Sequence, residues 1–202
     1  MAGSATLTVA PTTWPQATRW EGISHAIEAQ DPITAAHGNR VGAYALAIAK
    51  ALSIPPAKAE IIRIGACLHD IGKIAIPKNI LNKPGPLTVE EFQIVKLHPL
   101  IGRKMLEPGA AFEPFLPIVE LHHEHSDGSG YPHGLTHREI PFGVRIVQVA
   151  DVYDALTSTR PYRGPLSQAE SIEILLSGAG LRWDPEVIRV FVSMLKNPAS
   201  VA

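Results

Sequence analysis

Two adjacent histidines, His122 and His123, stand directly before a loop that is rich in glycine. A histidine pair is uncommon in an apolar core, and a loop of this kind lets the backbone approach a ligand closely. Elsewhere in the chain a histidine–aspartate pair, His69 and Asp70, follows an apolar stretch. Imidazole and carboxylate together suit iron, manganese, nickel, zinc or cobalt. These residues therefore indicate the chemistry of a bound transition metal.

Two acids strengthen the indication of a metal site, because both stand in apolar surroundings. Asp70 follows "IGACL", and Asp151 lies inside "VQVADVYDAL". Burying a carboxylate costs roughly several kcal/mol unless it is paired or binds a metal. Taken alone, His37 fits a surface histidine and His98 fits a helix end, so only the set as a whole argues for a metal. The candidate ligands are His37, His69, Asp70, His98, His122, His123 and Asp151.

The composition fits a single globular domain. The chain has 202 residues, of which 46% are hydrophobic and 18% charged, and its formal net charge is −1. Such a charge argues against long nucleic acid as a partner. No apolar run reaches membrane-spanning length, since Lys50 and Lys58 interrupt the most hydrophobic region, and no signal peptide is predicted. The single cysteine, Cys67, excludes an internal disulfide and suits a cytoplasmic protein.

Helical signals run along most of the chain and predict an all-α fold. An aspartate followed by proline, at 31–32 and again at 184–185, is typical of a helix start. The capping-box pattern at 88–91 and 167–170 predicts two more starts. A further helix is expected over 56–70. These elements must position the candidate ligands.

The remaining segments set the limits of the domain. Residues 144–158 favour a buried helix, although their valines leave a strand open. Residues 1–16 have no periodicity and contain two prolines, so we expect an N-terminal arm or the remnant of a linker. Residues 17–197 are predicted to form one domain.

Short motifs in a fixed order cover nearly the whole chain, from about residue 20 to about residue 195. Together they resemble the HD-GYP family, a branch of the HD superfamily that consists of metal-dependent cyclic di-GMP phosphodiesterases. An HD dipeptide alone is a weak signal, whereas eight motifs in order are a strong one. The motifs are "HGNRV", "HDIGKIAIP", "ILNKPGPLT", "HP", "HHE", "DGSGYP", "VADVYDALTSTRPYR" and "DPEV". The resemblance implies an HD-domain helical bundle with an HD-GYP extension.

The resemblance also implies a binuclear centre of two divalent or mixed-valent metal ions. Iron or manganese is favoured, and zinc, nickel or cobalt stays open. One ion would be held by His37, His69, Asp70 and Asp151. The other would be held by His98, His122 and His123, with Asp70 bridging the two ions.

Other residues are assigned to the substrate. By the resemblance Lys73 would contact a phosphate, and Arg160 and Arg163 would grip the dinucleotide. The alternative for the two arginines is a pair of solvated turn residues. For Tyr131, in the GYP signature at 130–132, substrate binding and packing on its own turn both stay open.

One acid is assigned by its spacing. Asp154 lies three residues after Asp151, on the same face of the predicted helix, so we expect it to support the ligands from behind. With Asp70 and Lys73 it makes up the candidate catalytic set.

The chain departs from the family pattern at two places. Some members carry a glutamate one helical turn before the first histidine and bind three metals, but Ile33 stands there in this chain. We therefore expect two metals. Members often carry a basic residue and a tryptophan before the glycine loop, where this chain has His125 and Ser126. The mode of base recognition therefore stays open.

The predicted activity is hydrolysis of cyclic di-GMP to linear pGpG, with further cleavage to GMP open, which would lower a bacterial second messenger. One alternative is an HD phosphohydrolase for another cyclic dinucleotide or nucleotide. Another is a catalytically silent module that binds cyclic dinucleotides. A GGDEF-type or other signalling protein that contacts the GYP loop, and a homodimer, are also open as partners.

Overall fold

The structure of the chain is a computed structural model that describes residues 22, 29, 31–159 and 164–197. Within these ranges every regular element is a helix and no strand forms, which confirms the all-α prediction. The predicted arm at 1–16 lies outside the described residues. The elements are α2 (Pro32–Ala51), α3 (Pro56–Leu68), η1 (Ile71–Ala75), α4 (Lys78–Leu81), α5 (Val89–Val95), α6 (His98–Leu106), η2 (Ala110–Phe115), α7 (Leu116–Leu121), α8 (Phe142–Thr157), α9 (Gln168–Ser177) and α10 (Pro185–Lys196), where η denotes a 3-10 helix.

The predicted helix starts are formed by the expected side chains. Asp31 caps α2 and Asp184 caps α10, each by accepting hydrogen bonds from backbone N–H groups of the first turn. Thr88 and Ser167 form complete capping boxes at α5 and α9. The segment at 144–158, where a strand was left open, is helical and makes up most of α8. Three of its four valines are buried and the fourth is partly buried against the core, and this packing outweighs the preference of valine for strands.

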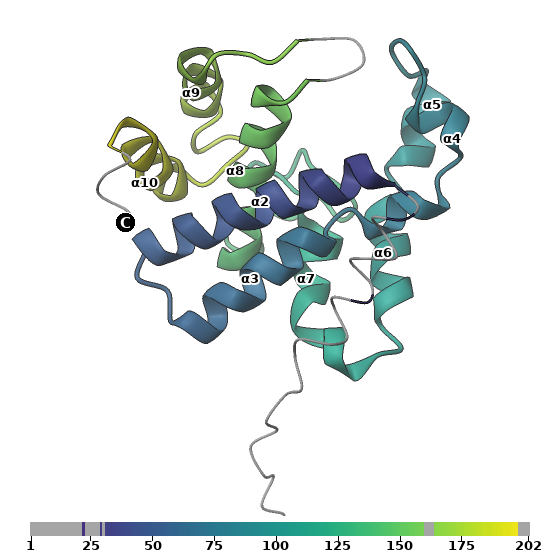
Figure 1. Cartoon of the computed structure of the whole chain (residues 1–202), viewed down its shortest axis with the longest axis horizontal. Coiled ribbons are helices and arrows are strands. Elements are labelled where there is room, and N and C mark those ends of the chain that lie inside the picture. Colours follow the sequence, from purple (N-terminus) through teal and green to yellow (C-terminus); the bar gives the residue numbers. More distant parts are fainter. Residues whose placement is uncertain (1–21, 23–28, 30, 160–163, 198–202) are drawn as a thin grey trace, which may run out of the picture.

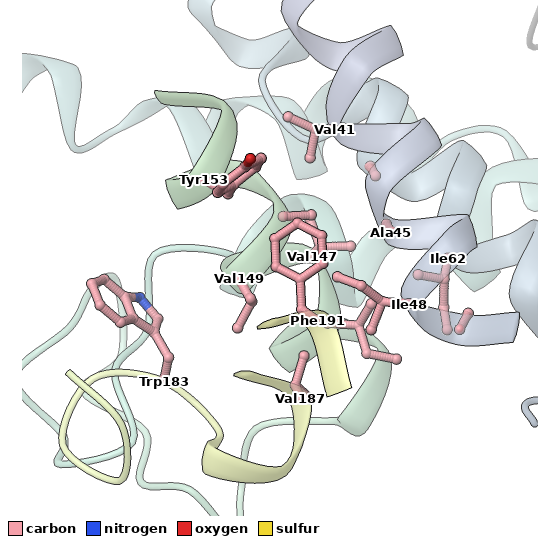
Figure 2. Close-up of a cluster of buried hydrophobic side chains, with 14 of the residues drawn as sticks. Val41, Ala45, Ile48, Ile62, Val147, Val149, Tyr153, Trp183, Val187 and Phe191 are labelled. Carbon is pink, nitrogen blue, oxygen red and sulfur yellow. The ribbon is translucent and has the colours of Figure 1, made fainter. Parts of the chain in front are cut away.

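The core lies where α2, α3, α8 and α10 meet. Figure 2 shows Ile48 of α2 beside Val147 of α8 and Phe191 of α10, all of which are fully buried or nearly so. A smaller apolar cluster packs α3 against η1, η2 and α7. It contains Leu68 and Ile71, which flank the HD pair on both sides. The HD pair is therefore held between two packed segments.

The helices are arranged around α2 and α3, which are antiparallel and joined by a short turn (Figure 1). Helices α9 and α10 lie at one end of the molecule, and α4 and α5 lie at the other end. The start of α2, the end of α3, the start of α6 and the end of α7 each carry a candidate ligand. Among the described helices, none is both long enough and apolar enough to span a bilayer.

Candidate metal centre

The first cluster of candidate ligands joins α2, the end of α3 and α8. His37, His69 and Asp70 offer ligand atoms within 4.8 Å of one another. Asp151 joins them, because its Oδ1 lies 3.0 Å from His37 Nε2 and 3.8 Å from His69 Nε2. All four side chains are buried or nearly so. The structure therefore brings together the residues that were predicted to hold the first metal.

The second cluster joins the same aspartate to α6 and the end of α7. Asp70, His98, His122 and His123 also offer ligand atoms within 4.8 Å of one another. Asp70 belongs to both clusters through different oxygens. Its Oδ2 lies 3.3 Å from His69 Nε2 in the first cluster, and its Oδ1 lies 3.2 Å from His98 Nε2 in the second. Asp70 thus stands between the clusters, where the resemblance to the HD-GYP family implies a bridging ligand.

The meeting of Asp70 with His98 depends on a glycine. A Cβ on Gly72 would lie 2.0 Å from the carbonyl oxygen of His98 and 2.6 Å from the backbone nitrogen of Gly102. Both contacts are with backbone, which cannot swing aside as a flexible side chain can. Gly72 therefore allows η1 and α6 to touch, and this contact brings the second cluster up to Asp70.

Three ligand histidines are oriented by hydrogen bonds from Nδ1 to backbone carbonyls. A carbonyl oxygen can only accept, so Nδ1 carries a hydrogen, and Nε2 is then the nitrogen that presents a lone pair when the ring is neutral. This arrangement is common behind metal-binding histidines. The bonds run from His69 to Ala66 (2.6 Å), from His98 to Val95 (2.7 Å) and from His122 to Val119 (2.9 Å).

The interior of the second cluster suits a cation. His98 Nε2 and His122 Nε2 are only 3.1 Å apart there, so two neutral rings with hydrogen on Nδ1 would turn their lone pairs toward each other. Burial, and then the charges of neighbouring histidines, hold the pKa of His122 well below its ordinary value, so that ring is neutral. Asp70 Oδ1 is buried and finds no hydrogen-bond partner among the described residues. A divalent metal ion fits this donor set, since it would use all three of these atoms.

The first cluster shows the same demand for positive charge. His37 Nε2 contacts Asp151, and its Nδ1 lies 2.7 Å from Asp154 Oδ2. Burial lowers the pKa of His37, but the hydrogen bonds to Asp151 and Asp154 outweigh it and raise this pKa to about 9. Metal binding at Nε2 would release that proton. The two carboxylates therefore mark a position that must hold a proton or a metal.

Asp154 lies behind His37, where its spacing predicts a supporting acid. It accepts from His37 on one side and from Arg40 on the other, with Arg40 Nε 2.7 Å from Asp154 Oδ1. Burial raises the pKa of Asp154, but hydrogen bonds from His37 and Arg40 prevail and lower it to about 2. Asp154 is thus a positioning residue that fixes the ring of His37.

Replacing Asp154 by alanine is expected to lower the metal affinity of the first cluster by roughly 10- to 100-fold, which is typical when such a supporting contact is lost. Asp154→Asn should be milder, because an amide oxygen still accepts from His37 Nδ1. Titration of metal-free protein with manganese measures both variants. Unchanged affinity in Asp154→Ala would show that His37 does not need this support.

Lys73 lies at the edge of the centre. Helix η1 places its ammonium nitrogen 2.5 Å from Asp70 Oδ2, with about a quarter of the side chain exposed. Burial raises the pKa of Asp70, but the charge of Lys73, followed by that of His69, holds this pKa well below its usual value. Lys73 therefore brings a positive charge to the same oxygen that faces the first cluster.

The GYP loop covers the second cluster. The Tyr131 ring stacks on His123, with centroids 4.7 Å apart and an interplanar angle of 27°. Gly130 is required here, because a Cβ would lie 2.4 Å from the Cα of Glu124. The buried carboxylate of Glu124 accepts backbone hydrogen bonds from His133 and Leu135. Tyr131 thus packs on a candidate ligand rather than only on its own turn, and a contact with substrate stays a prediction.

Two of the predicted substrate residues, Arg160 and Arg163, lie outside the described residues. Ile33, where a third-metal carboxylate would stand, is 82% exposed at the start of α2. Two supporting residues were not assigned in the sequence. They are Arg40, which lies within the motif "HGNRV", and Glu124, which lies within "HHE". The motifs could have indicated both residues, but their partners are distant in the sequence: Asp154 is 114 residues from Arg40, and His133 is 9 residues from Glu124.

Comparisons with known proteins agree with this geometry. A family model described as an HD domain matches residues 21–187. A cyclic di-GMP phosphodiesterase from Thermotoga maritima is 41% identical over 181 residues, which are 86% of this chain and 48% of that protein. A 3′3′-cGAMP-specific phosphodiesterase from Vibrio cholerae is 34% identical over 172 residues, 84% of this chain and 33% of that protein.

A solved structure gives the same result for the fold. An HDG"Y"P protein from Bdellovibrio bacteriovorus superposes with a TM-score of 0.69 at 25% identity, covering 86% of this chain and 56% of that one. In the sequence comparisons, the chain spans half or less of the length of the two curated relatives. With the family model matched over most of its length and the expected motifs in place, the chain belongs to the HD domain family, in agreement with the HD-GYP resemblance of its sequence.

Proposed function

We propose that the protein is a metal-dependent phosphodiesterase that hydrolyses cyclic di-GMP to linear pGpG. The observation that carries the proposal is Asp70, which presents one oxygen to each of two histidine clusters. Its neighbour Lys73 supplies a positive charge beside them. Two adjacent ligand clusters with a shared carboxylate are typical of phosphodiester hydrolysis with two metals. The curated relative from Thermotoga maritima supports the choice of substrate.

The residues of this chain divide the work as follows. His37, His69 and Asp151 would hold one ion, iron or manganese being favoured, and Asp70 would be shared with the second cluster. Two such ions, when bound, supply Lewis acidity that activates water at neutral pH and offsets charge on the phosphate. Lys73 would bind a phosphate oxygen whose charge increases during attack. A protein nucleophile is not needed for this chemistry.

The proposal is tested by product analysis with a metal count. Protein purified without oxygen and loaded with iron or manganese should contain about two ions per chain and convert cyclic di-GMP to pGpG, since two-metal sites require both ions. Removing the metals with a chelator should abolish turnover, and adding manganese should restore it. Full activity with one ion, or with three, would contradict the two-metal proposal.

Arg160 and Arg163 are expected to bind the dinucleotide rather than the metals. Each alanine variant should keep its metal content and mainly raise KM, because the guanidinium groups would hold ground and transition states alike. Steady-state kinetics and metal analysis on the same preparations measure both effects. Loss of metal in either variant, or an unchanged KM in both, would contradict this assignment.

A second candidate substrate is another cyclic dinucleotide. The relative from Vibrio cholerae favours it, and His125 and Ser126 change the segment before the GYP loop. These substrates would be ranked by the hydrolysis rates of cyclic di-GMP, 3′3′-cGAMP, cyclic di-AMP and mononucleotides. Tight binding of cyclic di-GMP by metal-loaded protein without turnover would instead support a silent binding module. GMP as an end product, a cytoplasmic location and a signalling partner at the GYP loop remain predictions.

A further inference from the structure

The end of α5 places a lysine between two aromatic rings at the edge of the second cluster. Lys96 Nζ lies 5.1 Å from the centroid of the Phe92 ring and 5.1 Å from that of the Tyr131 ring. The two rings are themselves edge to face, with centroids 6.4 Å apart. Tyr131 in turn stacks on His123. One aromatic ring therefore separates the Lys96 ammonium from a candidate metal ligand.

Among the described residues, no acid neutralises the charge of Lys96. No carboxylate of the described residues forms an ion pair with Lys96, whereas Lys73 and Lys83 each have one. Aromatic rings attract and orient an ammonium group but carry no net negative charge. Phe92 is 43% exposed, and Lys96 is half-buried, so the ammonium remains accessible from outside. Such an oriented cation is suited to an anionic ligand.

We infer that Lys96 binds the phosphate of the cyclic dinucleotide that is not being cleaved. The inference rests on the proposed function. A cyclic dinucleotide has two phosphodiesters on opposite sides of its ring, so when one lies at the clusters the other lies some distance away. Lys73 is at the clusters, in contact with Asp70, whereas Lys96 is beyond Tyr131. The two lysines thus offer one cation for each phosphate.

A contact with the uncleaved phosphate predicts a specific kinetic change. That phosphate keeps its charge during the reaction, so Lys96 should stabilise the bound substrate and the transition state equally. Lys96→Met keeps an unbranched, flexible side chain at this position and removes the charge. We expect its KM for cyclic di-GMP to rise about tenfold, with kcat within about twofold, because a half-exposed charged contact is weaker than a buried one. Metal content should not change.

Two matched variants complete the experiment. Lys96→Arg keeps the charge and should restore KM to within about threefold of wild type. Lys50→Met makes the same type of substitution at the far end of α2, about 20 Å from His37, and should behave as wild type. The KM of wild type should rise with salt more steeply than that of Lys96→Met, since the variant lacks one screened contact.

The outcomes separate the two proposals when binding of cyclic di-GMP to metal-loaded protein is measured alongside turnover. Binding by wild type without cleavage would overturn the proposed function. The role of Lys96 would then be tested by comparing the Kd of cyclic di-GMP for wild type and for Lys96→Met. Cleavage by wild type with an unchanged KM in Lys96→Met would overturn only the role of Lys96. Loss of metal, or an equal loss of kcat in Lys96→Met and Lys96→Arg, would show that Lys96 merely supports the fold at Tyr131.

Discussion

Asp70→Ala is expected to abolish hydrolysis of cyclic di-GMP and to reduce metal binding at both clusters. The reason is its position, because Oδ2 faces His69 and Oδ1 faces His98. Loss of a supporting contact alone typically lowers metal affinity by about 10- to 100-fold, so loss of a shared ligand should exceed that. Metal analysis after gel filtration and an assay of pGpG formation measure the two effects.

The control for Asp70→Ala removes one negative charge elsewhere. Glu173 is exposed on α9, and Glu173→Ala should keep wild-type metal content and turnover. Circular dichroism should show that both variants remain helical. An Asp70→Ala protein that retained one full metal and wild-type activity would show that Asp70 is not shared between the clusters.

Lys73→Ala is expected to lower kcat strongly while metal content does not fall. Lys73 carries no lone pair for a metal when protonated, and its ammonium contacts Asp70 at the edge of the centre. Charged contacts of this kind cost about 2–5 kcal/mol when they are broken in a desolvated site. About a quarter of the side chain is exposed, so the lower part of that range applies, which corresponds to roughly 30-fold or more in kcat.

The effect of Lys73→Ala should be confined to the chemical step. Single-turnover kinetics at saturating protein would separate cleavage from product release. Lys78→Ala removes an exposed lysine from α4, five residues further along, and serves as the matched control. A Lys73→Ala protein with normal kcat and a raised KM would assign Lys73 to binding of substrate instead of to the developing charge.

Elements and candidate ligands could be predicted from the sequence where they rest on local chemistry. Asp31 and Asp184 cap their helices because an aspartate before proline at a helix start is a local pattern. The apolar setting of Asp70 and Asp151 indicated that both needed a cation. Resemblance added which histidines would share them. For the segment at 144–158, the apolar run favoured a helix but its valines left a strand open, and burial against other helices determined the outcome.

Features that depend on distant contacts were not predictable in the same way. Arg40 has an ordinary position on α2, and its role comes from Asp154, which is 114 residues away. The same applies to Lys96, whose position between two aromatic rings depends on how α5 meets the GYP loop. Gly72 was part of a recognised motif, but its contact with the backbone of His98 required the packed structure.

The spread of the ligands along the chain affects how the protein unfolds. The two clusters bring together side chains from His37 to Asp151, and these two residues are far apart in the sequence. A bound ion would therefore stabilise the native state by its binding free energy, because these ligands come together only in the folded chain. A free ion concentration of about 100 times Kd would add roughly 2.7 kcal/mol to the free energy of unfolding. Metal supply in the cell would thus govern the lifetime of the fold as well as its catalysis, and starvation for metal would expose the chain to proteolysis.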